Sequence, residues 1–288
     1  MSAIAQLLEP HIQDLGGFSA RRSLPHAELM TVGPFIFLDH LGPAVFAPGK
    51  GVDVRPHPHI NLATVTYLFT GALLHRDSLD NVREIRPGAV NWMSAGKGIV
   101  HSERSPASER QIESTLHAIQ TWVALPEAAE ESEPWFHHYP ESEIPRWSEG
   151  GVDVVLITGA CQGYQSPVRT ASPMIYLDLD FAPAGKFILE PNYPERAIYT
   201  VTSGICIDGE ELPQHRLAVL SPGSTVTISA LVQSRCVVIG GNSVGDRHKW
   251  WNFVSSRSAR IERAKKDWQE GHFPQVPEES EFIPLPDR

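Results

Sequence analysis

In Arg55-Pro-His57-Pro-His59, two histidines stand two residues apart, and the same spacing returns further along the chain in His101-Ser-Glu103. Residues two apart on a β-strand point to the same face of the sheet, so each pair can project into one interior. Pro56 and Pro58 remove two backbone donors and stiffen the approach, which would position both imidazoles before an ion arrives. The pattern predicts one metal site made by His57, His59, His101 and Glu103.

Three imidazoles and one carboxylate suit a borderline divalent ion. Imidazole favours such metals and the carboxylate adds hardness and charge, whereas structural zinc more often recruits cysteine. The ligand set alone leaves iron, nickel, copper, manganese and cobalt open. The alternatives are ordinary surface histidines and, for Glu103, a surface carboxylate paired with Arg55 or Arg104.

The glycines around these residues carry a family resemblance. Gly51-x5-His57-x-His59-x4-Thr64-x6-Gly71 has the spacing of the first cupin motif, with Thr64 where a cupin usually has a glutamate ligand. Gly88-x5-Ser94-Ala-Gly96-x4-His101-x-Glu103 resembles the second motif, with a glutamate added two residues beyond the histidine. The carboxylate ligand has therefore moved from the first motif to the second.

With its carboxylate in this shifted position, the chain resembles the pirin branch of the cupin superfamily. Three further stretches also resemble pirin sequences: Gly33-Pro-Phe-Ile-Phe-Leu-Asp-His40, Trp92-Met-Ser-Ala-Gly-Lys-Gly-Ile-Val-His-Ser-Glu-Arg104 and the tail from Gly241 to Pro286. The resemblance covers almost the whole chain. It implies an all-β protein of two tandem cupin (jelly-roll β-barrel) domains, a metal-binding one over residues 1–135 and one over residues 136–288 that lacks metal ligands and carries a C-terminal helix.

Resemblance to pirins also implies a chemistry. Several pirins act as quercetin 2,3-dioxygenases, so we expect one divalent ion, most plausibly Fe(II), with nickel, copper, manganese or cobalt as alternatives. The substrates would be O2 and a flavonol, whose 3-hydroxyl group Glu103 deprotonates before the ring opens and CO leaves. Walls for a flat aromatic substrate could come from Phe35, Phe37, Phe46, Trp92 and Met93, although such residues more often belong to a core.

The competing interpretation is a metal- or redox-sensing regulatory protein without enzymatic activity. Eukaryotic pirins are linked to transcription factors and bacterial ones to metabolic enzymes, so a protein partner is possible. A basic face on the first domain would favour this role, and six cations lie near the motifs: Arg55, Arg76, Arg83, Arg86, Lys97 and Arg104.

The rest of the chain reads as short strands separated by Gly, Pro and Asn/Asp turns, which indicates a sandwich or barrel. The expected strands include 62–69, 152–157, 174–181, 197–201 and 217–220. Residues 125–134 are acidic and bounded by prolines, and this predicts a linker or a short exposed helix. His40, His75 and His117 could orient a metal ligand, but a structural role is the commoner explanation for each.

The second half repeats the scaffold of the first without its ligands. Alignment on the turn glycines Gly71 and Gly204 puts Glu190 and Asn192 where His57 and His59 stand, and alignment on Gly96 and Gly223 puts Ile228 and Ala230 where His101 and Glu103 stand. Apolar side chains cannot coordinate an ion, so we expect no metal in this half.

A different pattern occupies residues 255–270. Ile261, Ala264 and Trp268 form an apolar stripe among charged residues, with Gly271 placed to end a helix. We expect this amphipathic helix to dock on the protein's own sheet, anchored by Trp250 and Trp251, rather than on a partner or a membrane.

Composition excludes several classes of function. The chain has 288 residues, 41% of them hydrophobic, and a formal net charge of −10, which argues against direct nucleic-acid binding because phosphate contacts need Lys and Arg. Three widely spaced cysteines in apolar surroundings indicate buried thiols in a reducing compartment. No stretch has the ~18 apolar residues that span a bilayer. We therefore expect a cytoplasmic protein without membrane contact.

Overall fold

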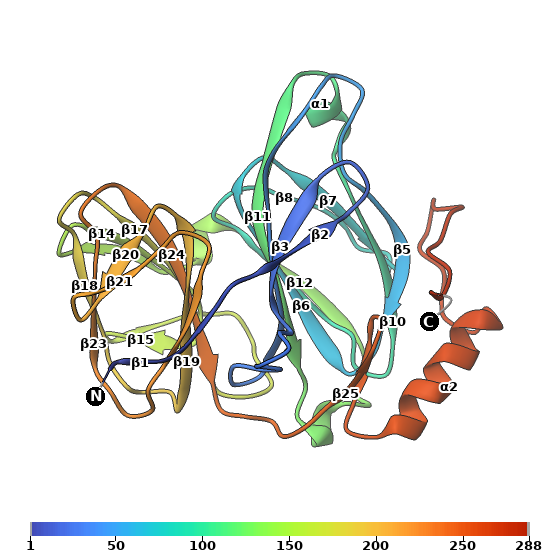
Figure 1. Cartoon of the computed structure of the whole chain (residues 1–288). Coiled ribbons are helices and arrows are strands. Elements are labelled where there is room, and N and C mark those ends of the chain that lie inside the picture. The colour runs from blue at the N-terminus through green and yellow to red at the C-terminus, as the bar shows by residue number, and fades with distance from the viewer. Residues whose placement is uncertain (1, 287–288) are drawn as a thin grey trace. The chain divides into compact units, whose positions relative to one another are not determined.

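A computed structural model describes residues 2–286 of the chain. The chain divides into two compact units, and each unit combines two separated segments (Figure 1). The N-terminal barrel consists of Leu41–Glu141 and Val244–Arg288, and the C-terminal barrel consists of Met1–His40 and Ser142–Ser243. The domain boundary at residue 135 stays a prediction.

The N-terminal barrel contains two antiparallel sheets. One has the strand order β5-β10-β7-β8, and the other has the order β12-β9-β6-β11, followed by β4, which begins in one unit and ends in the other. The strands are β4 (Phe35–Phe46), β5 (Asp53–His59), β6 (Leu62–Thr70), β7 (Leu73–Asp77), β8 (Val82–Ile85), β9 (Val90–Ser94), β10 (Ile99–Arg104), β11 (Ser114–Ala124) and β12 (Trp135–Tyr139). Short helical turns are α1 (Ala107–Arg110), η1 (Glu127–Ala129) and η2 (Glu141–Glu143).

The C-terminal barrel repeats this order. Its sheets run β18-β23-β20-β21 and β1-β22-β19-β24-β17-β14-β13. The strands are β1 (Ile4–Leu8), β13 (Arg146–Glu149), β14 (Val152–Thr158), β17 (Met174–Phe181), β18 (Lys186–Leu189), β19 (Glu195–Thr202), β20 (Ile205–Ile207), β21 (Glu210–Leu212), β22 (Leu217–Leu220), β23 (Val226–Ser229) and β24 (Ser234–Gly241). Two hairpins, β2 (His11–Asp14) with β3 (Ser19–Leu24) and β15 (Ala160–Cys161) with β16 (Tyr164–Gln165), complete the unit.

Strand register corrects one part of the predicted repeat. His57 lies opposite His101 in the N-terminal barrel, and Phe187 lies opposite Ile228 in the C-terminal barrel. The same register makes Leu189 the counterpart of His59, so the alignment with Glu190 and Asn192 is wrong by three residues. Five residues, 190–194, connect β18 to β19, whereas two residues, 60–61, connect β5 to β6, and alignment on the turn glycines could not show this difference. The register keeps Ile228 as the counterpart of His101.

The segment 125–134 departs from its prediction in one respect. A short helical turn is present at Glu127–Ala129, but the neighbouring Glu130 is fully buried instead of exposed. Its carboxylate accepts hydrogen bonds from the Ser255 hydroxyl and from the Ser256 amide and hydroxyl, and it pairs with Arg247 at 3.0 Å. A buried charge needs such partners, and all of them come from the end of the chain.

The C-terminal helix docks on its own barrel, as predicted. Helix α2 (Ser258–Gln269) follows the hairpin β25 (His248–Trp250) and β26 (Phe253–Ser255) (Figure 1). Its buried residues Ile261 and Ala264 pack with Ile60 and Phe253, and the partly buried side chains around them are Trp250, Trp251, Trp268, Phe273 and Leu285. Gly271 has a φ of 71°, which suits the end of a helix. None of the helices within residues 2–286 is long and apolar enough to cross a membrane.

The tail after α2 lies against the outer face of β5 and β10. The Arg104 guanidinium donates to both carboxylate oxygens of Glu279 at 2.9 and 2.7 Å, and the Ser102 hydroxyl donates to the same carboxylate at 2.8 Å. The Ile283 amide donates to the Pro56 carbonyl at 2.8 Å. Each of these barrel residues is a chain neighbour of a predicted metal ligand, so the tail holds the strands that carry the ligands.

Candidate metal centre

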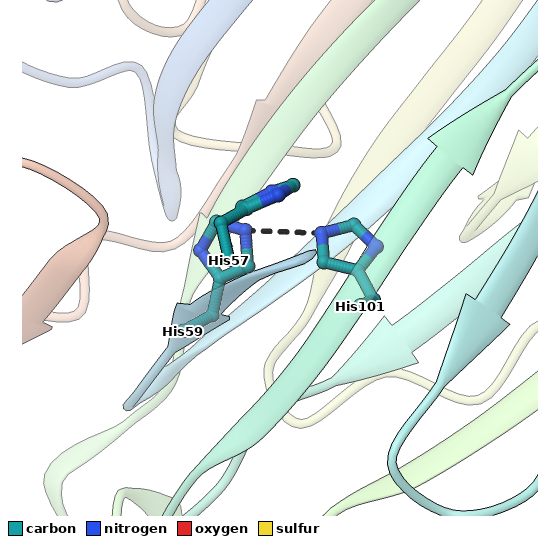
Figure 2. A group of neighbouring side chains, drawn as sticks. All are labelled: His57, His59 and His101. Atoms are coloured by element: carbon teal, nitrogen blue, oxygen red, sulfur yellow. Dashed lines mark hydrogen bonds between the residues drawn. The ribbon is translucent and has the colours of Figure 1, made fainter. Parts of the chain in front are cut away.

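Three histidines meet inside the N-terminal barrel. His57 and His59 come from the end of β5, and His101 comes from β10, directly opposite His57 (Figure 2). Their ring centroids are 4.4 to 5.0 Å apart, and one ring nitrogen of each lies within 4.8 Å of the others. The parity argument from the sequence therefore brought the correct side chains together, while their binding of an ion stays a prediction.

Backbone carbonyls orient two of these rings. Nδ1 of His57 lies 2.9 Å from the Arg55 carbonyl, and Nδ1 of His59 lies 3.2 Å from the Asn252 carbonyl. A carbonyl oxygen can only accept, so each Nδ1 carries the proton and donates it. The Nε2 atom of each neutral ring consequently keeps its lone pair, which is the form that binds a metal.

Burial keeps all three rings neutral. It lowers the pKa of His57 from 6.5 to about 4, a shift that neighbouring His75 increases and the Arg55 carbonyl opposes. The pKa values of His59 and His101 also lie well below 6.5, mainly because burial disfavours the charged ring. At neutral pH the site therefore offers three unprotonated imidazole ligands.

One contact shows that the donor set fits a cation. Nε2 of His59 lies 3.1 Å from Nε2 of His101, the pair joined by the dashed line in Figure 2. Since His59 Nε2 carries a lone pair, this distance suits either a hydrogen bond donated by His101 Nε2 or two lone pairs that share a cation. Imidazole nitrogen suits all five ions that the ligand set leaves open.

Glu103 lies near the histidines without joining their cluster. It is two residues beyond His101 on β10, and its Oε1 accepts a hydrogen bond from the Thr66 hydroxyl at 3.1 Å. Among the described residues, the group with all ligand atoms within 4.8 Å of one another contains the three histidines and not Glu103. Burial raises the pKa of Glu103, and the nearby His75 and the Thr66 hydroxyl partly offset this rise. The role of Glu103 as fourth ligand and base stays a prediction.

Aromatic side chains around the centre differ from those considered in the sequence. Trp122 packs edge-on against the His59 ring at 5.0 Å, and Phe136 stacks on the His75 ring at 4.3 Å. Both residues were missed because neither lies in a recognisable motif. The five residues considered before are buried in the core: Phe35, Phe37, Phe46, Trp92 and Met93.

Cations near the motifs are paired with carboxylates. Arg104 pairs with Asp53, Glu279 and Glu281, and Lys97 pairs with Glu133. Arg76 pairs with a tail carboxylate and Arg86 with two carboxylates of its own barrel. These pairs neutralise four of the six cations that were expected to form a basic face.

Two similar barrels, of which one carries a histidine cluster, define a bicupin with a single candidate metal centre within the described residues. Two family models match the chain, Pirin over residues 17–123 and Pirin C-terminal cupin domain over residues 176–274. A pirin-like protein of Caulobacter vibrioides is 47% identical over 281 residues, which is 96% of this chain and 96% of that protein. The chain belongs to the pirin family.

Other relatives carry the name of an activity. A Pseudomonas aeruginosa protein provisionally named quercetin 2,3-dioxygenase is 40% identical and aligns with 89% of this chain and 80% of its own length. The crystal structure of a quercetin 2,3-dioxygenase from Acinetobacter baumannii superimposes with a TM-score of 0.89 at 32% identity, covering 98% of this chain and 96% of that one. These likenesses confirm the predicted all-β fold of two cupin domains with a C-terminal helix.

Proposed function

We propose that this protein is a metal-dependent dioxygenase of the pirin type, which opens the ring of a flavonol such as quercetin with O2 and releases CO. The observation that carries the proposal is the convergence of three buried imidazoles beside a half-buried carboxyl group. The relatives named as quercetin 2,3-dioxygenases support the same reaction. We further propose that the ion is Fe(II), with nickel, copper, manganese or cobalt as alternatives.

Each side chain of the centre has a defined task in this proposal. Nε2 atoms of His57, His59 and His101 would hold the ion, with the Glu103 carboxylate as a fourth ligand. A bound divalent ion would supply Lewis acidity and open positions for substrate oxygen atoms. The three histidines are buried, with 1 to 7% of their surfaces exposed, and this limits the access of bulk water.

Glu103 is the proposed base. Burial raises the pKa of its carboxyl group, and a raised pKa makes the carboxylate a stronger base toward a phenolic proton. The Thr66 hydroxyl donates to one carboxylate oxygen, and the other oxygen would accept the proton of the flavonol 3-hydroxyl group when the carboxylate leaves the ion. Trp122, which packs edge-on against His59, adds apolar surface beside the centre.

The regulatory interpretation finds less support. It would be favoured by a basic face on the N-terminal barrel, and four of the six candidate cations are instead paired with carboxylates. A sensory role needs the same histidines, so an activity measurement is required to separate the two functions.

The test is anaerobic reconstitution with each of the five ions, followed by quercetin and O2 with detection of CO and of the loss of flavonol absorbance. We expect turnover in the wild type and a loss of at least about a hundredfold in Glu103→Gln, the usual scale for removing a general base, with metal retained. Glu133→Gln is the matched control, because Glu133 is an exposed glutamate of the same barrel. Stoichiometric metal without turnover for any ion would refute the dioxygenase and leave the regulatory role.

A further inference from the structure

The third histidine of the centre, His101, differs from the other two in the partner of its Nδ1 atom. Backbone carbonyls orient His57 and His59 through their Nδ1 atoms. Nδ1 of His101 instead faces Nδ1 of another histidine, His75 on β7, at 3.5 Å. An imidazole can accept or donate at this position, so what lies behind His75 decides the orientation of His101.

A buried carboxylate lies behind His75. Oδ2 of Asp77 is 3.0 Å from His75 Nε2, and Asp77 is fully buried while His75 is 4% exposed. Asp77 also accepts from the amides of Leu79 and Asn81 and from the Asn81 side chain. With donors at both of its oxygens, the Asp77 side chain acts as a hydrogen-bond acceptor.

The direction of the hydrogen bonds then follows step by step. Because Asp77 accepts, His75 donates from Nε2, and in this Nε2–H tautomer the lone pair is at Nδ1. Nδ1 of His101 donates to that lone pair, and this leaves the lone pair of His101 at Nε2. Nε2 is the atom that lies 3.1 Å from Nε2 of His59. Asp77 and His75 together thus orient the His101 ring, as the carbonyls of Arg55 and Asn252 orient the rings of His57 and His59.

Packing fixes the ring that transmits this effect. Phe136 stacks on His75 with an angle of 11° between the ring planes. In the pairing of β7 with β10, His101 lies opposite Asp77 and Glu103 lies opposite His75. His75 therefore adjoins both predicted ligands of β10, and neither its position nor its ring plane is free to change.

We propose that Asp77 and His75 are positioning residues that hold His101 with its Nε2 lone pair toward the centre and thereby raise the affinity of the barrel for its ion. The inference rests on the metal site of the proposed function, but it does not depend on the dioxygenase reaction. The expected effect is that removal of the support weakens metal binding by about 10- to 100-fold.

The test measures the Co(II) dissociation constant by competition with a chelator, together with the Co(II) absorption spectrum. We expect His75→Phe, which preserves the stacked ring but has no polar atom, to bind 10- to 100-fold more weakly with an altered spectrum. His75→Gln should recover most of the affinity, since its amide can accept from His101 and donate to Asp77. His138→Phe is the matched control: it removes a partly buried histidine of the same barrel that bonds to Asn91, and its affinity should not change.

A second variant covers the case in which His75→Phe does not fold. Asp77→Asn keeps the shape of the side chain but leaves the turn amides and His75 only one acceptor oxygen, so we expect a loss of about tenfold. Affinities within twofold of the wild type, or equal losses in His75→Phe and His75→Gln, would overturn the inference and leave the dioxygenase standing. Tight metal binding without flavonol turnover would refute the dioxygenase alone. A wild type that binds no ion would overturn both.

Discussion

The two barrels share one strand order, but equivalent interior positions are polar in one barrel and apolar in the other. At the positions set by strand register, the N-terminal barrel has His57, His59 and His101, whereas the C-terminal barrel has Phe187, Leu189 and Ile228. The surrounding sheets are ordered in the same way. The jelly roll therefore supplies the positions, and the side chains at those positions supply the chemistry.

The energetic consequences of the two interiors are also opposite. Each fully buried Leu, Ile or Phe stabilises a fold by about 1.5–3 kcal/mol, so the C-terminal barrel gains stability at these positions. A buried imidazole instead requires a hydrogen-bond acceptor, because an unpartnered polar group costs about 1–3 kcal/mol. In the N-terminal barrel the carbonyls of Arg55 and Asn252 meet part of this requirement.

The largest expected effects come from substitutions at equivalent positions of the two barrels: one should weaken metal binding and the other should lower folding stability. His59→Ala should weaken metal binding by on the order of 10²–10³-fold, because one of three imidazoles contributes about a third of a binding free energy of ~10 kcal/mol or more, and the fold should persist. Leu189→Ala should leave metal binding unchanged and lower the free energy of unfolding by about 2–5 kcal/mol. Metal titration and denaturant unfolding of both variants test this, and a full metal complement in His59→Ala would refute the site.

Acid should affect the two barrels unequally in the metal-free protein. The pKa of His57 is about 4 in the fold and about 6.5 in an unfolded chain, so between these values the unfolded state binds more protons. Stability is fully present above pH ~6.5 and falls as the pH approaches 4, by about 3 kcal/mol for this residue. Hydrogen-exchange protection of β5 and β10 should decrease from pH 7 to pH 5 more than that of β18 and β23. Equal decreases would contradict the comparison.

The smallest expected effect concerns the outer faces of the barrels. In the N-terminal barrel the tail covers the outer face of the strands that carry the histidines: the Glu279 carboxylate, 8% exposed, binds Arg104 and Ser102. In the C-terminal barrel the equivalent outer face is open, since Ile188 on β18 is 51% exposed. Glu279→Gln should destabilise the N-terminal barrel by about 1 kcal/mol, because it replaces charge-assisted hydrogen bonds with neutral ones. Glu281→Gln, at a more exposed partner of Arg104, should have an effect near zero. Unfolding monitored by exchange of β5 and β10 compares the two, and equal effects would argue against the tail as a support.

Local patterns in the sequence predicted much of this molecule. Expected strands at 174–181 and 217–220 coincide with β17 and β22, and the apolar stripe through Ile261 and Ala264 located the docked face of α2. Parity along a strand paired His57 with His59, and the resemblance to the two cupin motifs predicted that His101 would join them. Each of these features depends on residues that are near one another in the chain or belong to a spaced motif.

Features that depend on distant partners could not be predicted. Glu130 reads as one more residue of an acidic segment, yet its hydrogen bonds come from Ser255 and Ser256. Asn252 contributes a main-chain carbonyl to His59, and any residue at that position would present the same atom. The pairing of β1 with β22 likewise joins the two separate segments of the C-terminal barrel without a local signal.

The division of each barrel into two segments also has a consequence for biosynthesis. Strand β1 precedes its partner β22 by most of the C-terminal barrel's sequence, and the orientation of His59 depends on Asn252, which follows all three histidines in the chain. During translation the histidines would therefore appear long before the carbonyl that fixes one of them. The full set of contacts that orients the histidines would accordingly exist only after Asn252 has been synthesised, so the barrel whose histidines appear first depends on residues that appear much later.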